Sequence, residues 1–261
     1  MKIAIVTGAS SGIGREFAER IGNGENLDEI WVIARRIERL EELKNTIKIP
    51  VRAISLDLND QNDVEKYKRA LIDSNPNVRV LVNAAGYGRI GVAETLPNSE
   101  QLGMIDLNAR ALTEITLITL LYMNVGAKIY QVASMSAFAP IPYLSVYAAT
   151  KAYVLSFSRS LNVELRQRGI RCMAVTPGWV RTEFLERAED ENEMVVYYDR
   201  FYTSDQVVKR ALRDMKRGKA VSVCGIATRA KILGMKCLPH SWVMRIWCSQ
   251  QRKMRRKRRT K

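Results

Sequence analysis

Short apolar runs of strand length alternate along the chain with longer segments in which apolar residues recur every three or four positions. The runs carry little polar alternation, which is typical of strands that are buried on both faces of a sheet. They lie at residues 3–7, 29–34, 51–56, 78–82, 128–132, 170–175 and 220–223, and the helical segments lie at 13–21, 37–47, 60–73, 100–123 and 145–168. This order predicts a single doubly wound (Rossmann) α/β domain, a parallel sheet of about seven strands with helices on both faces. Such sheets bind ligands beyond the carboxyl ends of their strands.

Charge is distributed unevenly along the 261 residues. All 27 acidic residues lie at or before Asp214, whereas 15 of the 42 Lys and Arg lie after it. Residues 1–214 therefore have a formal net charge of zero, and the whole +15 belongs to the C-terminal segment. This distribution argues against a globally basic nucleic-acid-binding domain, and we expect no specific nucleic-acid partner.

Several classes of site are excluded by the residues that would have to build them. The sequence has a single histidine, His240, so a site with two or more histidine ligands is ruled out, and we expect no metal. The four cysteines form no Cys-x2-Cys pair and fit free thiols in a reducing compartment. We find neither a signal-peptide core nor an apolar stretch long enough to span a bilayer, so the sequence predicts a cytoplasmic protein.

A glycine-rich loop, Thr7-Gly8-Ala9-Ser10-Ser11-Gly12-Ile13-Gly14, joins the first predicted strand to the first predicted helix. Glycines there allow a tight turn and the close approach of a pyrophosphate, and the following helix N-terminus offers free N–H groups to the anion. The spacing is Gly-x3-Gly-x-Gly rather than the generic Gly-x-Gly-x-x-Gly, and a tight turn that binds nothing is the alternative. The expected cofactor-binding residues of the loop are Gly8, Ser10, Ser11, Gly12, Ile13 and Gly14.

The second predicted strand ends where a dinucleotide-binding fold usually places an acid for the adenosine ribose. Here that position is Ala34, followed by Arg35 and Arg36. A carboxylate would repel a 2′-phosphate, whereas a guanidinium group can bind it through two hydrogen bonds. The sequence therefore favours NADP(H) over NAD(H), with Arg35 and Arg36 as ligands. The alternative is that both arginines simply begin the next helix in solvent.

Tyr147 and Lys151 are four residues apart in a predicted helix and therefore share a face. Ser134 follows the fifth predicted strand and could meet both at the carboxyl edge of the sheet. A phenol with a pKa of about 10 is a poor base at neutral pH, and a nearby ammonium favours its ionised form. Tyr147 could then transfer a proton while Ser134 hydrogen-bonds a developing alkoxide, as interconversion of a carbonyl and an alcohol requires.

Together these motifs resemble those of the short-chain dehydrogenase/reductase family, in the family's order over roughly residues 1–225. Residues 7–14 are similar to its cofactor loop, Asp57-Leu58 to its adenine-side motif and Asn83-Ala84-Ala85-Gly86 to the motif after its fourth strand. Pro177-Gly178-Trp179-Val180-Arg181-Thr182 resembles the segment that closes over nicotinamide. The resemblance implies a catalytic set of Asn108, Ser134, Tyr147 and Lys151 and further cofactor contacts from Asp57, Leu58, Asn83, Ala84, Gly86, Tyr147, Lys151, Pro177, Gly178, Val180 and Thr182. It also implies that Lys151 holds the nicotinamide ribose, and Asn108 is expected to order a water that connects Lys151 to solvent.

Residues 1–225 are therefore interpreted as the dinucleotide-binding and catalytic domain, with a substrate lid at about 183–204. Apolar and aromatic residues are frequent in this segment, namely Phe184, Leu185, Met194, Val195, Val196, Tyr197, Tyr198, Phe201 and Tyr202. With residues 139–144 opposite, they indicate an apolar pocket, although they could equally bury the lid's own helices. The expected substrate is a bulky, lipophilic carbonyl compound or secondary alcohol, such as a hydroxysteroid.

Residues 226–261 form a basic extension with two parts. Trp242, Val243, Ile246 and Trp247 recur at helical spacing, and residues 252–259 carry seven positive charges in eight positions. Residues 241–261 would suit peripheral contact with an anionic membrane. The alternative is a helix packed on its own body or on a partner subunit, followed by a solvated tail.

The sequence thus predicts an NADP(H)-dependent oxidoreductase of the short-chain type, with Tyr147 as general acid and base and a small-molecule substrate. We also expect a homo-oligomer. The competing function is a non-catalytic dinucleotide-binding adaptor that its basic tail holds at a membrane or an RNA. The intact set of Asn108, Ser134, Tyr147 and Lys151 argues against that alternative.

Overall fold

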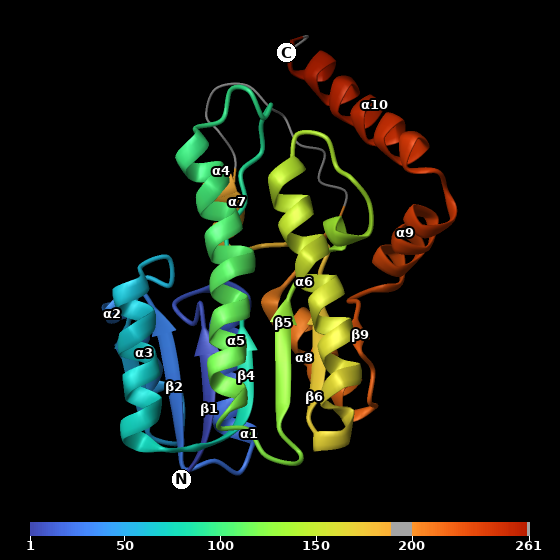
Figure 1. The fold of residues 1–261 in the computed structure, drawn as a ribbon. Coiled ribbons are helices and arrows are strands. Elements are labelled where there is room, and N and C mark those ends of the chain that lie inside the picture. The colour runs from blue at the N-terminus through green and yellow to red at the C-terminus, as the bar shows by residue number, and fades with distance from the viewer. Residues whose placement is uncertain (189–199, 260–261) are drawn as a thin grey trace.

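The computed structural model describes residues 1–188 and 200–259 and confirms the predicted doubly wound sheet (Figure 1). Seven strands pair in the order β3-β2-β1-β4-β5-β6-β9, and every pair is parallel. They are β1 (Lys2–Thr7), β2 (Glu29–Ala34), β3 (Val51–Ser55), β4 (Asn77–Asn83), β5 (Lys128–Val132), β6 (Arg171–Val175) and β9 (Val221–Ser222). A second, two-stranded sheet pairs β7 (Trp179–Val180) with β8 (Phe201–Tyr202).

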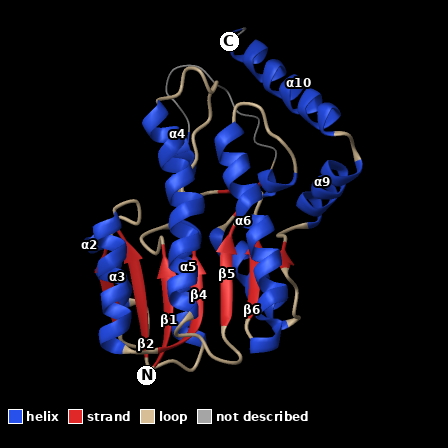
Figure 2. Ribbon diagram, in the orientation of Figure 1, coloured by secondary structure: helices blue, strands red, loops and turns tan. Residues whose placement is uncertain are grey.

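Helices follow the strands and cover both faces of the sheet (Figure 2). In chain order they are α1 (Gly12–Gly24), α2 (Ile37–Glu41), α3 (Gln61–Ser74), α4 (Asn98–Ile105), α5 (Leu112–Leu120), α6 (Ser145–Glu164), α7 (Glu183–Ala188), α8 (Ser204–Lys216), α9 (Ile226–Cys237) and α10 (His240–Arg259). Short 3-10 helices extend or connect them at η1 (Glu42–Asn45), η3 (Met135–Phe138) and η4 (Leu165–Arg168).

Two hydrophobic cores, one on each face, hold these layers together. Because side chains alternate along a strand, β1 contributes to both. Ile3 and Ile5 pack with residues of α3, α5 and α6, the helices that lie in front of the sheet in Figure 1. Ala4 and Val6 pack with residues of α1, η1 and α8 on the other face. Because the strands are buried on both faces, their sequences are unbroken apolar runs.

The helix predicted over residues 100–123 contains an irregularity that periodicity did not reveal. It divides into α4, a π-helical segment, η2 (Asp106–Ala111), and α5. The buried Asn108 lies in the π-helical segment. A wider turn of this kind changes the direction in which a side chain leaves the helix, and such turns are frequent at functional sites.

The chain changes direction across the sheet at β1, which pairs with β2 on one side and with β4 on the other. The connection that leaves β1 turns toward β2, whereas the connection that leaves β4 turns toward β5. The two connections therefore diverge at the carboxyl ends of β1 and β4 and leave a crevice there, where open α/β sheets bind their ligands. The glycine loop and the segments after β4 and β5 all leave the sheet at this edge (Figure 1). Ser134 lies in the segment after β5.

The last two helices, α9 and α10, extend from β9 past this same edge (Figure 1). A third apolar cluster joins them to the body, since Val243 of α10 packs with Ile90, Ile141, Leu144 and Ala188. Among the helices of the described residues, none is long and apolar enough to cross a bilayer. Within the same residues, no group of three or more His, Cys, Asp or Glu could hold a metal ion.

Candidate active site

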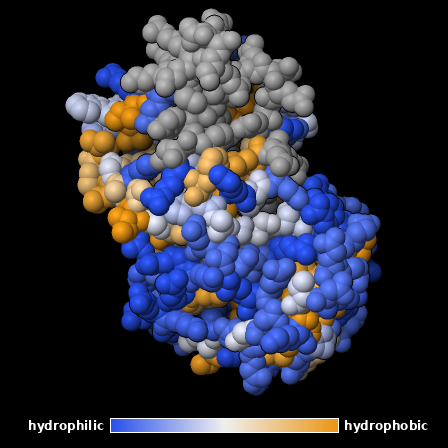
Figure 3. Space-filling model, turned by 180° about the vertical axis from the view of Figure 1, so that it is seen from behind, coloured by the Kyte–Doolittle hydropathy of each residue, from blue (hydrophilic) through white to orange (hydrophobic). Residues whose placement is uncertain are grey.

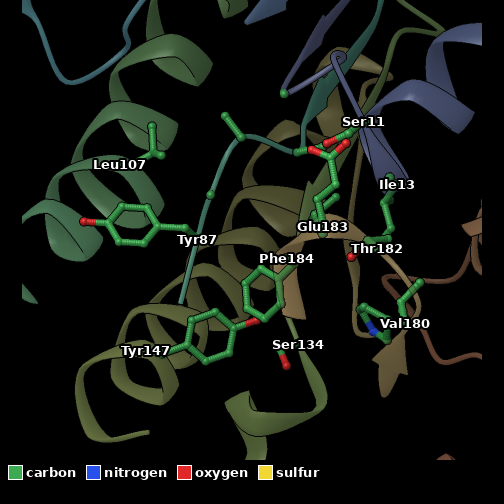
Figure 4. Close-up of a pocket in the computed structure, with 18 of the residues that line it drawn as sticks. Ser11, Ile13, Tyr87, Leu107, Ser134, Tyr147, Val180, Thr182, Glu183 and Phe184 are labelled. Atoms are coloured by element: carbon green, nitrogen blue, oxygen red, sulfur yellow. The ribbon is translucent and has the colours of Figure 1, made fainter. Parts of the chain in front are cut away.

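A cavity of about 840 Å³ lies at the carboxyl edge of the sheet and contains almost every residue singled out in the sequence (Figure 4). The sequence-derived residues that line it are Gly8, Ser10, Ser11, Gly12, Ile13, Gly14, Arg35, Arg36, Asp57, Leu58, Ala84, Gly86, Ser134, Tyr147, Lys151, Pro177, Gly178, Val180 and Thr182. Asn83 and Asn108 do not line it. One continuous space therefore joins the glycine loop to the Ser134, Tyr147 and Lys151 group.

The glycine loop is folded so tightly that side chains cannot replace its glycines. Gly8 and Gly12 have φ angles of +67° and +57°, which only glycine adopts without strain. A Cβ on Gly14 would lie 2.2 Å from the carbonyl oxygen of Gly8. Ser11 is the N-cap of α1, and its side chain makes no capping hydrogen bond. The first N–H groups of α1 are thus not capped by Ser11, as an anion-binding loop requires.

Arg36 lies directly against this loop. Its guanidinium donates to the hydroxyl oxygens of Ser10 and Ser11 at 3.2 and 3.3 Å. Arg35 lies farther out, 59 % exposed, with Nη1 3.9 Å from Asp57 Oδ2. Ala34, the last residue of β2, lines the cavity, so no carboxylate stands at the end of that strand.

Two charged residues that the sequence did not single out complete this end of the cavity. The carboxylate of Glu183, the first residue of α7, pairs with Arg36 at 2.8 Å and with Arg39 at 3.2 Å. Both Arg39 and Glu183 line the cavity. The hydrogen bond from Arg36 is the main reason that the pKa of Glu183 lies below its usual value, and Ser11 adds a smaller contribution. The carboxylate is therefore ionised at neutral pH.

At the other end, Lys151 lies one helical turn after Tyr147 on α6. Its ammonium donates a 2.8 Å hydrogen bond to the carbonyl oxygen of Val132 and lies 5.7 Å from the centre of the Tyr147 ring. Ser134 follows β5 and lines the cavity, with its hydroxyl group near that of Tyr147. The three side chains predicted to act together thus converge at one place (Figure 4 shows two of them).

The protonation equilibria of this group differ from the sequence-based expectation. Burial raises the pKa of Tyr147 to about 12, although the nearby Ser134 hydroxyl acts in the opposite direction. Burial also lowers the pKa of Lys151 to about 8. The expectation that Lys151 brings the phenol toward neutral pH is not met here, because burial of the phenol is the dominant effect on its pKa and the ammonium lies 5.7 Å from the ring centre. Tyr147 is accordingly a protonated acid at neutral pH.

The side chains of Asn108 and Asn83 hydrogen-bond neighbouring segments of the chain and do not line the cavity. The amide of Asn108 accepts from Tyr87 N at 3.1 Å and donates to Tyr87 O at 2.9 Å and to Thr150 Oγ1 at 3.1 Å. These bonds fix the segment after β4 to α6. Asn83 Nδ2 donates to Thr116 Oγ1 on α5 at 2.9 Å. A Cβ on Gly86 would lie 2.7 Å from Asn108 Oδ1, so glycine is needed at that crossing.

The substrate end of the cavity is apolar, and part of its lining was foreseen. Phe184 and Leu185 of the expected lid line it, as do Ile141 and Leu144 of the opposite segment. Phe201 and Tyr202 form β8 instead and do not line it, whereas residues 194–198 lie outside the described part of the chain. The Phe184 ring lies against that of Tyr147, with centroids 5.5 Å apart (Figure 4).

Met235 of α9 and Trp247 of α10 also line this end, which the sequence did not reveal. The indole N–H of Trp247 donates to the carbonyl oxygen of Pro142 at 2.9 Å. The tryptophan spacing had indicated a helix but not the surface it covers. The extension after residue 225 therefore contributes to the cavity.

The comparisons with known proteins agree with this geometry. Residues 2–193 match the model of the short chain dehydrogenase family. A sulfoacetaldehyde reductase of Chromohalobacter salexigens is 36 % identical over 185 residues, which cover 69 % of this chain and 72 % of that protein.

Two solved structures resemble most of the fold. A short-chain dehydrogenase from Sphingobium yanoikuyae in complex with NADPH superimposes with a TM-score of 0.77 at 29 % identity, over 90 % of this chain and 92 % of that one. A bulky-bulky ketone specific alcohol dehydrogenase from Comamonas testosteroni gives 0.72 at 26 % identity, over 90 % and 91 %.

Proposed function

We propose that this chain, which belongs to the short-chain dehydrogenase family, is an NADP(H)-dependent reductase of bulky, lipophilic ketones that also catalyses the reverse oxidation of secondary alcohols. The observation that carries the proposal is the single cavity that joins Arg36 on the glycine loop to Ser134, Tyr147 and Lys151. A non-catalytic dinucleotide-binding adaptor would need no such group of proton-transferring side chains.

The shape of the cavity fits a nicotinamide dinucleotide. The glycine loop would offer N–H groups to the pyrophosphate, Asp57 and Leu58 would border the adenine, and Lys151 would hold the nicotinamide side. When bound, the dinucleotide supplies or accepts the hydride. The chain's own groups then have to hold the substrate oxygen and move the proton.

Tyr147 is the proton donor in the reductive direction. With its pKa raised to about 12, the phenol stays protonated at neutral pH and can give its proton to the oxygen of a carbonyl. Ser134, whose hydroxyl group lies near the same phenol, stabilises the negative charge that develops on that oxygen. Lys151 adds a positive charge beneath the site, while its bond to Val132 O fixes its position.

Preference for NADP(H) is supported by the charges at the adenine end. Arg36 contacts Ser10 and Ser11, Arg35 lines the same end, and Ala34 replaces the acid that would repel a 2′-phosphate. A guanidinium binds a phosphate through charge-assisted hydrogen bonds, which are roughly twice as strong as neutral ones.

Preference for a bulky substrate is supported by the apolar lining. Ile90, Ile141, Leu144, Phe184, Met235 and Trp247 surround the space beyond Tyr147. A panel of ketones and secondary alcohols of increasing size, followed by nicotinamide absorbance with NADPH and NADH, tests the proposal. We expect turnover of bulky ketones with NADPH. If no carbonyl compound is reduced with either cofactor, the catalytic proposal is wrong and the adaptor alternative takes its place.

We further propose that the C-terminal extension docks on an anionic membrane surface. Trp242 and Ile246 of α10 are 57 % and 49 % exposed, and Figure 3 shows hydrophobic residues gathered on the side where α9 and α10 lie. Residues 252–259 add seven positive charges directly after them. Adjacent apolar and basic residues are typical of helices that lie in a membrane interface.

We also propose that a second copy of the chain packs on the α4, α5 and α6 face. Large apolar side chains are exposed there, namely Leu102, Ile105, Leu117, Leu121, Tyr153 and Val163. Exposed apolar side chains that gather on neighbouring helices mark an association site more often than a free surface. Light scattering after size-exclusion chromatography tests it, and a monomer at micromolar concentration would contradict it.

A further inference from the structure

A carboxylate lies in the part of the cavity that the glycine loop prepares for an anion. Glu183 reaches from α7 to Arg36 and Arg39, and Figure 4 shows it beside Ser11. The two carboxylate oxygens are divided between the two guanidinium groups, at 2.8 Å to Arg36 and 3.2 Å to Arg39. Ser11, the N-cap of α1, lies beside Glu183 and adds to the lowering of the pKa of its carboxyl group.

The groups around this carboxylate are those that would bind a phosphate. Two guanidinium groups, a serine hydroxyl and the start of a thirteen-residue helix all offer donors or positive charge to one place. A carboxylate and a phosphate carry the same sign of charge and accept the same hydrogen bonds. They cannot share these donors without strong repulsion.

We propose that Glu183 occupies the anion site of the dinucleotide and must be displaced by one of its phosphate groups. The inference rests on the proposed function, because it requires that a dinucleotide binds in this cavity. A dinucleotide whose phosphate enters this site then binds at the expense of the Glu183 ion pairs. Since Glu183 and Arg36 are 39 % and 45 % exposed on their side chains, these pairs are weak enough to be broken by a ligand.

The displaced residue is connected to the substrate end of the cavity. Glu183 is followed by Phe184, whose ring lies 5.5 Å from that of Tyr147. Gly88 packs against both rings, since a Cβ there would lie 2.8 Å from each. A shift of the α7 backbone that carries Glu183 away from Arg36 would therefore also move Phe184 relative to Tyr147. Occupation of the phosphate site is in this way linked to the space in which the carbonyl group must lie.

Equilibrium titration of the full-length chain with NADPH and with NADH tests the inference without any substrate. The variant is Glu183→Gln, which keeps the size of the side chain and removes its charge. Glu65→Gln is the matched control, because Glu65 pairs with Lys68 on α3 and does not line the cavity. We expect Glu183→Gln to bind NADPH about threefold to tenfold more tightly than the wild type and the control to bind as the wild type does.

The two cofactors identify which phosphate displaces Glu183. A gain for NADPH alone assigns the site to the 2′-phosphate, and an equal gain for NADH assigns it to the pyrophosphate. Unchanged or weaker binding of both would overturn the inference, because Glu183 would then position the arginines rather than compete for them. If the wild type binds neither dinucleotide, the proposed function itself fails.

Hydrogen exchange provides a second measurement. In the wild type, NADPH should increase the exchange of the amides in α7, because their anchor at Glu183 is released. In Glu183→Gln the same amides should exchange faster before any cofactor is added. An α7 whose exchange is the same in both proteins and is unchanged by NADPH would contradict the link.

Discussion

The ammonium of Lys151 donates a hydrogen bond to the carbonyl oxygen of Val132, and this contact ties α6 to the carboxyl end of β5. Tyr147 lies one turn before Lys151 on that helix, and Ser134 lies two residues after Val132. A single buried contact therefore sets the distance between the two hydroxyl groups. Because Lys151 is only 5 % exposed, its removal would leave a cavity as well as an unpaired carbonyl.

Replacement of Arg36 should change cofactor choice. In Arg36→Gln we expect NADPH affinity to fall about tenfold to a hundredfold, because one charge-assisted contact is lost. The affinity for NADH should change little. Direct titration with both cofactors measures this. Arg166→Gln, at an exposed position in η4, should leave both affinities unchanged. A wild type that prefers NADH would contradict the assignment of Arg36.

An added methyl group at Gly88 should displace the Phe184 ring or the Tyr147 ring. A Cβ there would lie 2.8 Å from atoms of both Phe184 and Tyr147, so one ring has to move. We expect Gly88→Ala to lower kcat by about tenfold or more, because a displaced catalytic group is costly. Gly24→Ala is the control, since its Cβ would meet nothing within 4 Å. Equal kcat values for the two variants would show that Tyr147 is not held where the structure has it.

The rates of ketone reduction and of alcohol oxidation should depend differently on pH. Ketone reduction needs the protonated phenol, which predominates below a pKa of about 12, so its rate should not increase from about pH 6 to pH 8. Alcohol oxidation needs the phenolate, whose fraction rises with pH below that pKa, so its rate should increase over the same range. Steady-state rates in both directions measure this. An oxidation rate independent of pH would contradict Tyr147 as the base.

Two truncations should separate the roles of the extension. Deletion of residues 252–261 removes eight positive charges and no residue that lines the cavity. We expect kcat on a water-soluble substrate to be retained and sedimentation with anionic vesicles at low salt to fall sharply. Deletion of residues 240–261 removes Trp247 as well and should raise KM for a bulky ketone. Equal sedimentation of the full-length and shorter chains would exclude the membrane proposal.

Much of the fold could be predicted because each strand is buried on both faces. The strand predicted at 29–34 is β2 without change, and the one at 78–82 is β4 to within one residue at each end. The π-helical segment around Asn108 could not be predicted, since apolar spacing is the same in a helix with one wider turn.

The site was predictable where it depends on chain order and not where it depends on distant packing. Tyr147 and Lys151 share a face of one helix, so their spacing was sufficient. Arg39 and Glu183 are 144 residues apart, and Trp247 and Pro142 are 105 apart. No local pattern relates such pairs. The pKa of Tyr147 also depends on burial that only the folded chain provides.

Turnover by Tyr147→Phe, measured beside dinucleotide binding, tests the central claim most directly. The variant loses one hydroxyl group, and Tyr153→Phe makes the same change on the same helix, at a hydroxyl that contacts Thr113 instead. We expect Tyr147→Phe to lower kcat for ketone reduction by about a hundredfold to ten-thousandfold, the usual value of acid–base catalysis, with NADPH affinity nearly unchanged. Tyr153→Phe should retain the wild-type kcat. If Tyr147→Phe keeps more than about a tenth of that kcat, Tyr147 is not the proton donor.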